Sequence, residues 1–402
     1  MKSNNPELRF KEFKDEWQKV KLRNLTERVR GNDGRMDLPT LTISAANGWL
    51  DQKDRFSGNI AGKEQKNYTL LKKGELSYNH GNSKLAKYGM VFVLKNFKEA
   101  LVPRIYHSFK TTNEASPYFI EAMFATKKPD KELGKLISSG ARMDGLLNIN
   151  YEDFVGINIT VPKIDEQNKI GDFILSLEST INLSQQELDA LKQTKQGFLQ
   201  KMFPKDEETV PEVRFSGFLE DWNDCLIGDV ATVSMCKRIF KGQTSENGEI
   251  PFYKIGTFGK KPDSFISREL YLEYKNKYSY PDKGDILISA SGTIGRTVIY
   301  DGQESYYQDS NIIWLKRKEN KISNLFLYQF YKIVNWNQVE GSTIKRLYNE
   351  TILSTRIKVP SMQEQIKIGE FFRQLDEVIE LKEKEIEALK ETKKGFLQKM
   401  FI

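Results

Sequence analysis

Two long stretches of the chain share one repeating pattern of apolar and polar positions. Residues 164–203 and 362–401 match at a constant offset of 198, and in both the pattern recurs at alternating steps of four and three. A period of 3.5 residues is typical of a helix that packs lengthwise on another helix. We call these positions the seam: Ile170, Ile174, Leu177, Ile181, Ser184, Leu188, Leu191, Lys195, Phe198 and Met202 in the first stretch, and Ile368, Phe372, Leu375, Ile379, Lys382, Ile386, Leu389, Lys393, Phe396 and Met400 in the second.

The length of both stretches and their matched polar positions favour a helix pair. Eight positions of each seam are apolar, and the same two are polar. A helix of about 38 residues is roughly 57 Å long at 1.5 Å per residue. Two separate amphipathic core helices are the alternative, but they explain neither feature. Ser361 and Glu364 have the spacing of a capping box, which predicts the start of the second helix; Lys163 takes that place before the first, so its start is less sharply defined.

The repeat extends beyond the helices. Residues 6–17 return at an offset of 205 as residues 211–222, sharing Pro, Glu, Arg, Phe, Phe and Trp, and residues 205–210 form a polar joint between the halves. A chain of 402 residues fits two or three domains. We therefore predict an α+β fold with an internal pseudo-two-fold repeat: globular domains at 1–162 and 206–360, and long helices at 163–205 and 361–402.

Short runs of β-branched and aromatic residues predict a mainly antiparallel sheet in each domain. The runs are 76–78, 90–94, 286–288 and 312–315, and residues 116–126 and 323–334 predict helices. Residues 73–76 match residues 283–286, and Gly140 with Leu146 matches Gly341 with Leu347. The sequence thus predicts one scaffold that carries two different faces.

The charge becomes informative once it is divided along the chain. The net charge is +7; residues 165–203 and 363–402 together carry −3, so the remaining residues carry +10. This excess favours a polyanionic partner for the globular domains. We expect a cytoplasmic protein, since the chain has no apolar run near 18 residues, no signal peptide, and only two cysteines, Cys225 and Cys236.

Motifs of catalysis are missing from the sequence. There is no Gly-x4-Gly-Lys-Ser/Thr phosphate loop and no Gly-x-Gly-x-x-Gly cofactor loop, and the chain has only two histidines, His80 and His107. Cys236, beside two basic residues, has the setting of a reactive thiol. Without a paired His and Asn or Asp, a partly buried structural cysteine is the better interpretation.

Polar, glycine-containing segments with basic residues recur at equivalent places in both halves. Their Asn, Arg, Lys, Ser and Thr side chains are the types that bind base edges and phosphates. Each alone is more often a solvated turn, but the recurrence favours DNA. The candidates are Asn79, His80, Asn82, Lys84, Lys87, Gly140 and Arg142 in the first half, and Lys237, Arg238, Ser291, Thr293, Arg296, Asn311, Ser342, Thr343, Lys345 and Arg346 in the second.

The chain resembles the specificity subunits of type I restriction–modification enzymes over essentially its whole length. The resemblance rests on two Pro-Glu-x-Arg-Phe-x-x-Phe-x-x-x-Trp segments, two Val-Pro-x3-Glu-Gln-x2-Ile-Gly helix starts and two Gly-Phe-Leu-Gln-Lys-Met-Phe endings. It implies two target-recognition domains, each reading half of a bipartite double-stranded DNA target and held apart by antiparallel helices. Contacts between the helices and to partner subunits are expected from the seam and from Glu166, Gln167, Glu364 and Gln365.

The resemblance also implies partners that perform the chemistry. Two methyltransferase subunits would carry S-adenosylmethionine and methylate adenine, and ATP- and Mg-dependent restriction subunits would join through them. No cofactor, metal or membrane contact is then expected for this chain. One competing hypothesis is a fused methyltransferase–nuclease, which needs a cofactor loop that we do not find. Another is a coiled-coil scaffold without DNA binding, which leaves the basic excess unexplained.

Overall fold

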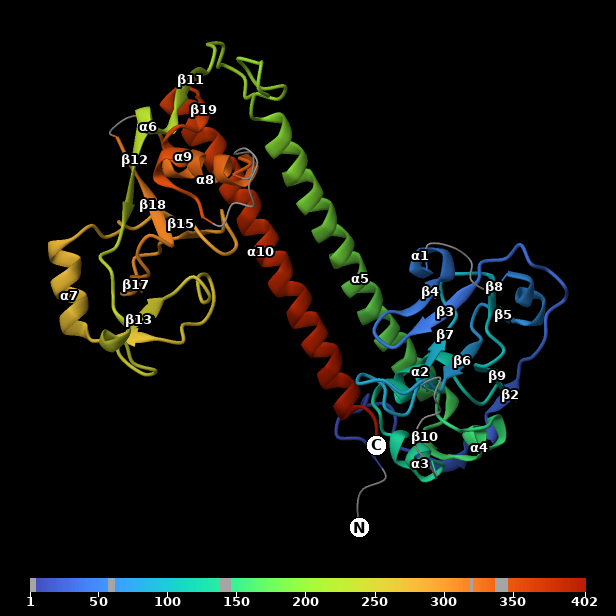
Figure 1. The fold of residues 1–402 in the computed structure, drawn as a ribbon. Helices are drawn as coiled ribbons and strands as arrows, with labels where there is room; N and C mark the ends of the chain where they lie inside the picture. The colour runs from blue at the N-terminus through green and yellow to red at the C-terminus, as the bar shows by residue number, and fades with distance from the viewer. Residues whose placement is uncertain (1–4, 57–61, 138–145, 319–320, 337–345) are drawn as a thin grey trace. The chain divides into compact units, whose positions relative to one another are not determined.

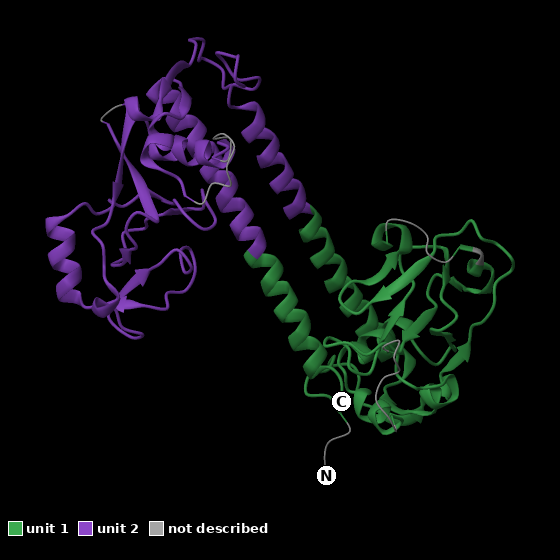
Figure 2. Cartoon of the chain, viewed as in Figure 1, with its two compact units in different colours: residues 1–186, 384–402 green, residues 187–383 purple. Residues whose placement is uncertain are grey.

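The structure is a computed structural model that describes residues 5–56, 62–137, 146–318, 321–336 and 346–402 (Figure 1). The chain forms two compact units: unit 1 contains residues 1–186 and 384–402, and unit 2 contains residues 187–383 (Figure 2). Each unit holds one globular domain, the beginning of the long helix that follows it, and the end of the other long helix. The boundaries predicted from the sequence keep each helix whole, whereas both helices are shared between the units.

The domain of unit 1 is built on a four-stranded antiparallel sheet with the strand order β2-β9-β6-β7. Two-stranded ribbons accompany it, formed by β1 with β10, β3 with β4, and β5 with β8. The strands are β1 (Gln18–Lys21), β2 (Thr26–Arg28), β3 (Leu41–Ser44), β4 (Gly48–Asp51), β5 (Thr69–Lys72), β6 (Leu76–Asn79), β7 (Met90–Val93), β8 (Glu99–Val102), β9 (His107–Thr111) and β10 (Asn158–Val161).

Short helices complete this domain. Pro117 opens α2, since its fixed φ suits the first helical turn, and α2 packs on β7. The apolar residues of α2 and of the central strands meet in one core, which also takes in Ile170 and Ile174 of the long helix. The helices are α1 (Gln52–Phe56), α2 (Pro117–Ala125), α3 (Asp130–Lys135) and α4 (Tyr151–Gly156), with 3-10 turns η1 (Leu22–Asn24) and η2 (Gly62–Asn67).

The domain of unit 2 repeats this plan around a sheet with the strand order β12-β18-β15-β16. β11 pairs with β19, while β13 pairs with β14 antiparallel and with β17 parallel. The strands are β11 (Asn223–Leu226), β12 (Ala231–Met235), β13 (Ile250–Tyr253), β14 (Phe265–Ile266), β15 (Ile286–Ser289), β16 (Thr297–Ile299), β17 (Tyr306–Tyr307), β18 (Ile312–Arg317) and β19 (Arg356–Val359). The helices are α6 (Ile227–Val230), η3 (Lys241–Gln243), α7 (Arg268–Lys277), α8 (Asn324–Ile333) and α9 (Asn349–Leu353).

The strands and helices predicted inside the domains are confirmed as β6, β7, β15, β18, α2 and α8. The loop alignment needs a correction of one residue. Isolated bridges join Gly81 to Leu146 in unit 1 and Ser291 to Arg346 in unit 2. Leu146 is therefore equivalent to Arg346, not to Leu347. The error arises because the sequence match followed a polar loop whose length differs between the halves.

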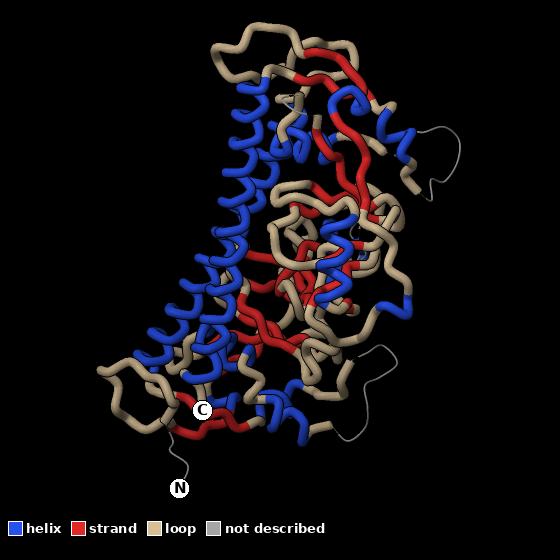
Figure 3. The backbone as a smooth tube through the Cα atoms, turned by 90° about the vertical axis from the view of Figure 1, so that its left-hand side faces the viewer, coloured by secondary structure: helices blue, strands red, loops and turns tan. Residues whose placement is uncertain are grey.

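The two long helices are α5 (Ile164–Lys201) and α10 (Met362–Lys399), each continuous over 38 residues (Figure 3). Every seam position is buried or half-buried, which confirms the 3.5-residue period. In unit 1, Phe173 of α5 and Phe396 of α10 have ring centroids 4.8 Å apart. In unit 2, Phe198 and Phe371 lie 5.1 Å apart. The beginning of each helix thus packs beside the end of the other, so the helices are antiparallel within each unit.

The capping box predicted at the start of α10 is only half formed. The Glu364 backbone N–H donates to Ser361 Oγ at 3.4 Å, as predicted. Its carboxylate instead accepts two hydrogen bonds of 2.8 Å from the Arg214 guanidinium. Glu166 of α5 accepts the equivalent pair from Arg9, each of 2.7 Å. A bidentate arginine is a stronger partner for a carboxylate than a backbone N–H.

The glutamine that follows each of these glutamates binds the backbone of its domain. Gln167 accepts from the Ser116 N–H at 3.1 Å and donates to Pro162 O at 2.9 Å. Gln365 makes equivalent bonds in unit 2 to Ser323 N and Pro360 O. Glu166, Gln167, Glu364 and Gln365 are each at most 2% exposed. These four residues anchor the helix starts to the globular domains, a role that the sequence did not predict, and their predicted contacts to the other helix and to partner subunits stay predictions.

The repeated endings of the long helices complete the domain cores. Phe401 packs on Trp17 and Phe119, with centroids 6.3 and 5.1 Å away. Phe203 packs in the same way on Trp222 and Phe326 in unit 2. The segments before each domain join these endings through backbone bonds of 2.9 Å, from Leu8 N to Lys399 O and from Val213 N to Lys201 O. The three repeated motifs therefore meet in each unit.

Candidate nucleic-acid interface

Three of the predicted DNA-contacting residues lie together at the edge of the unit 2 sheet where β15 ends and β18 begins. Ser291 follows β15, Asn311 precedes β18, and Arg346 is bridged to Ser291. Ser291 Oγ donates to Asn311 Oδ1 at 2.8 Å, and Arg346 Nη2 donates to Ser310 O at 2.7 Å. Asn and Arg are the side chains that pair bidentately with adenine and guanine in the major groove. This cluster, called here the unit 2 face, presents amide and guanidinium donors held by short hydrogen bonds.

Buried hydrogen bonds of Ser289, which is 1% exposed, stabilise the turn between β15 and β16. Its hydroxyl donates to Thr293 O and accepts from the Arg296 N–H at 2.9 Å. Gly295 has φ +81°, and a Cβ there would lie 2.7 Å from Trp336 Cδ1, so this position requires glycine. Sequence reasoning did not single out Ser289, because a serine inside a strand carries no signal of the turn it supports.

The other candidates of unit 2 differ in their availability. Arg296 Nη1 donates to Phe258 O at 3.0 Å, so this half-buried arginine ties two loops together. Arg238 is exposed but paired with Asp309 at 2.7 Å, while Lys237 and Thr293 are exposed. Arg238, Lys237 and Thr293 therefore remain candidates for DNA contact, and Arg296 acts mainly as a structural residue.

In unit 1 the equivalent edge is apolar where unit 2 is polar. The bridges and strand registers make Gly81 equivalent to Ser291 and Leu146 equivalent to Arg346. The same registers place Ile105, which is 41% exposed, at the position of Asn311. The frame of the edge is thus shared while the three side chains differ in chemistry.

His80 is a structural residue, which corrects its prediction as a DNA contact. It is 5% exposed, and its ring nitrogens lie 2.7 Å from Leu147 O and 3.0 Å from Ile105 O. The ring also stacks on His107, with centroids 4.9 Å apart. Burial lowers the pKa of His107 to about 4, so that ring is neutral near pH 7. Asn79 is likewise occupied, because it accepts from the Gly81 N–H at 3.0 Å.

The loop after His80 carries the remaining described candidates of unit 1. Asn82, Lys84 and Lys87 are exposed, and reciprocal 3.1 Å backbone bonds between Ser83 and Ala86 hold the loop in a tight turn. These three side chains remain candidates for contacts to bases or phosphates. Other predicted residues lie outside the described part of the chain: Gly140, Arg142, Ser342, Thr343 and Lys345.

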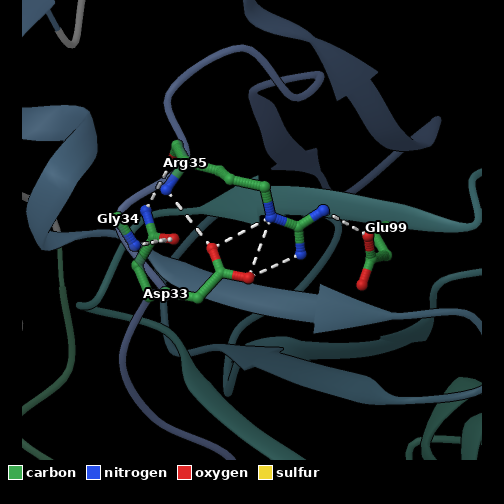
Figure 4. Close-up of polar contacts among 5 residues, drawn as sticks. Asp33, Gly34, Arg35 and Glu99 are labelled. Atoms are coloured by element: carbon green, nitrogen blue, oxygen red, sulfur yellow. Dashed lines mark hydrogen bonds and ion pairs between the residues drawn. The ribbon is translucent and has the colours of Figure 1, made fainter.

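Exposure alone does not make an arginine available. Arg35 Nη1 donates to Glu99 at 2.7 Å, and its Nε and Nη2 reach Asp33 (Figure 4). Hydrogen bonds to Asp33 and Glu99 raise the pKa of Arg35, while those from Arg35 lower the pKa of both carboxyl groups. Two carboxylates neutralise the charge of Arg35, which thereby links β8 to the loop before β3. The guanidinium has few free donors with which to bind a phosphate.

The structure also bears on two chemistries that the sequence disfavours, a reactive thiol and a metal site. Cys236 is 2% exposed, and burial raises the pKa of its thiol to about 12, which confirms a structural cysteine. Across the described residues, no group of three or more His, Cys, Asp or Glu side chains is placed to hold a metal ion. In the same described residues, no helix is long and apolar enough to span a membrane.

Comparisons with known proteins point in one direction. The family profile described as "Type I restriction modification DNA specificity domain" matches residues 219–391. A putative type I restriction enzyme specificity subunit of Haemophilus influenzae is 62% identical over 142 residues, which are 35% of this chain and 37% of that protein. The putative MjaX specificity subunit of Methanocaldococcus jannaschii is 21% identical over 96% of this chain and 93% of its own length.

Solved structures share the fold. The S subunit of a type I restriction–modification system from M. genitalium matches with a TM-score of 0.62 at 16% identity, covering 99% of both chains. A chain from a study of assembly and conformational transition of a type I system matches with a TM-score of 0.52 at 14% identity, covering 96% of this chain and 97% of its own. These structures show a shared fold, and the chain is similar in sequence to type I restriction enzyme specificity subunits, by the family profile over residues 219–391 and by the MjaX subunit over nearly its whole length.

Proposed function

We propose that this chain reads a bipartite double-stranded DNA sequence for a type I restriction–modification complex in the cytoplasm. Each globular domain recognises one half of the target, and the long helices set the length of the unread spacer. The helices also dock two methyltransferase subunits, through which restriction subunits join. The chain itself performs no chemistry, and S-adenosylmethionine, ATP and Mg belong to its partners.

The observation that carries this proposal is the contrast between two equivalent edges. Gly81, Ile105 and Leu146 of unit 1 occupy the positions of Ser291, Asn311 and Arg346 in unit 2. A scaffold duplicated for stability alone has no reason to change all three of these side chains. Different donors and apolar groups on one frame are what reading two different base sequences requires.

The charge distribution and the missing motifs support the same proposal. The +10 carried by the residues outside the helices supplies the phosphate attraction on which DNA affinity depends. The sequence has no phosphate loop or glycine-rich cofactor loop. Calorimetry on the purified chain should therefore detect no stoichiometric binding of S-adenosylmethionine or ATP, and such binding would contradict the assignment of both to the partners.

The direct test is methylation-sensitive sequencing of DNA from cells that express the chain with its methyltransferase. We expect a single split motif. Replacing Arg346 with Ala should weaken one half-site by about 1–3 kcal/mol if the guanidinium binds a base, or reduce the salt slope of binding by about one if it binds a phosphate.

A matched control separates this effect from a change in net charge. Arg356→Ala also removes one exposed positive charge from unit 2, but that side chain pairs with Asp224 across the β11–β19 ribbon. It should leave the motif and the affinity unchanged. The absence of a split motif would refute the proposed function, whereas an unchanged motif, affinity and salt slope for Arg346→Ala would remove only this residue from the interface.

A further inference from the structure

A carboxylate on α5 joins three parts of unit 1. Glu178 Oε2 lies 2.7 Å from Lys95 Nζ, in the segment between β7 and β8, and Glu178 Oε1 lies 2.7 Å from Lys393 Nζ, on α10. Lys95 also pairs with Glu121 of α2 at 2.6 Å. Burial alone would raise the pKa of Glu178, but the two ammonium groups lower it below its usual value. The domain and both long helices are therefore held together through one ionised side chain.

Unit 2 contains a similar cluster around the equivalent position of α10, although its domain lysine comes from α8 and not from a segment between strands. Asp376 of α10, offset by 198 from Glu178, contacts Lys195 of α5 and lies 3.1 Å from Lys332 of α8. Lys195 and Lys393 are polar positions of the seam, each of which would otherwise interrupt an apolar contact. Each thus binds the acidic residue that faces it on the antiparallel helix. The recurrence makes an accidental surface pair a poor explanation.

Other ion pairs join the two helices to each other. Lys192 of α5 pairs with Glu383 of α10 at 2.6 Å, and both side chains are about half exposed, at 49% and 48%. Lys382 likewise pairs with Glu187 at 2.6 Å. These contacts join one long helix to the other. The clusters at Glu178 and Asp376, by contrast, constrain the angle at which a domain meets its helices.

The Glu178 cluster lies beside a cleft lined by the domain and by both long helices of unit 1. The cleft has a volume of about 770 Å³, and its wall includes Trp49, Phe92, Tyr118 and Leu397. Apolar contacts are non-directional and tolerate small rotations, whereas ion pairs with short hydrogen bonds depend on geometry. Across this cleft, the lysine–carboxylate contacts add a directional constraint to the one that Glu166 and Gln167 provide at the start of α5.

We propose that Glu178 and Asp376 are positioning residues that make the complex discriminate between spacer lengths. This inference rests on the proposed function. Adding one base pair to a spacer moves a half-site by about 3.4 Å and turns it by roughly 35°, given about 10.5 base pairs per turn. A domain fixed to both helices cannot follow that movement. A domain that keeps only its apolar contacts and the anchors at the start of its own helix has more freedom to adjust.

The test uses the full chain assembled with its methyltransferase subunits and duplexes that keep both half-sites while the spacer varies by one base pair either way. Glu178→Gln and Asp376→Asn remove the charge with little change in shape. In each variant, the ratio of methylation at altered spacers to methylation at the natural spacer should rise about tenfold, which corresponds to 1.4 kcal/mol. Glu383→Gln removes a helix–helix pair alone and should leave the ratio unchanged.

Each outcome decides the question. If the unmodified complex methylates no split site, the proposed function itself has failed. If it does, and Glu178→Gln lowers methylation at all spacers by one factor, the cluster only stabilises the fold and the inference is overturned; an unchanged ratio overturns it too. If that variant does not assemble, Lys332→Met removes only the domain's arm from the Asp376 cluster, and its ratio must rise in the same way or the inference falls.

Discussion

Two glycines of the long helices, Gly369 and Gly197, offer a stability test with a matched control. Glycine inside a helix costs about 1 kcal/mol relative to alanine, so Gly→Ala in a helix usually stabilises. At Gly369 of α10, however, a Cβ would lie 2.4 Å from Leu325 Cβ and 3.0 Å from the Leu325 carbonyl carbon. The side chain is missing there because α10 passes directly against the start of α8.

The expected cost follows from these distances. Carbon atoms at optimal contact are about 3.5–4.0 Å apart, so the new methyl group forces the helices apart or displaces Leu325. Overpacking a core costs about 1–3 kcal/mol, and this approach lies at the upper end. After subtracting the gain in helix propensity, Gly369→Ala should destabilise unit 2 by about 2 kcal/mol. For a folding unit of 150–250 residues this lowers the melting temperature by roughly 4–8 °C.

Gly197 supplies the matched control. It lies in α5 within the same unit, and a Cβ there would meet no atom within 4 Å. Gly197→Ala should therefore raise the melting temperature of unit 2 by about 2–4 °C. Thermal unfolding followed by near-ultraviolet circular dichroism measures both variants. The reasoning is refuted if Gly369→Ala is at least as stable as the unmodified protein, or if both variants shift in the same direction.

Three further predictions address other features. Burial holds the pKa of His107 near 4 in the folded state, whereas the pKa of a histidine in the unfolded chain is about 6.5. As the pH falls between these two values, the unfolded chain therefore binds a proton that the folded chain does not. Stability should decline over that window by roughly 3 kcal/mol at most, and His107→Asn should flatten the pH dependence of the melting temperature. Glu364→Gln leaves a nearly buried arginine without its counter-ion and should cost about 3 kcal/mol in urea unfolding, whereas the exposed Glu383→Gln should cost under about 1 kcal/mol. Inserting four residues between Gln186 and Glu187 adds about 6 Å of helix and keeps the seam approximately in register. Sequencing of methylated sites should therefore show both half-sites with a spacer longer by one or two base pairs. Activity on the original spacing alone would show that the helices do not set the spacer length.

The parts of the fold that were predictable are those in which sequence spacing maps directly onto burial. The seam was correct because a 3.5-residue period places each position on one side of a helix, whatever it packs against. The strands β6 and β15 were recognisable from short apolar runs beside glycine. Glu166 was different: its partner Arg9 is 157 residues away, and no local spacing reveals such a contact. The repetition of both residues in the second half was the signal that would have found it.

The candidate interface was predictable only by residue type. Ser291, Asn311 and Arg346 were selected because polar side chains in loops are usually accessible. His80 met the same criterion but is buried, since two backbone carbonyl groups at that edge take its ring nitrogens as partners. Ser289 was missed for the opposite reason, as it belongs to a strand. Whether a polar residue serves the protein or a ligand depends on its neighbours in space.

The segment before each domain forms a backbone hydrogen bond with the end of a long helix, and this bond has a consequence for how the gene can be rearranged. In unit 2 the bond from Val213 to Lys201 joins residues linked by a short connecting segment, whereas in unit 1 the same bond joins Leu8 to Lys399, at opposite ends of the polypeptide. The packing is alike with and without a covalent link. The contacts within each unit therefore do not depend on the order in which the two halves are encoded. A gene that places the second half before the first, with the connecting segment moved accordingly, specifies the same contacts.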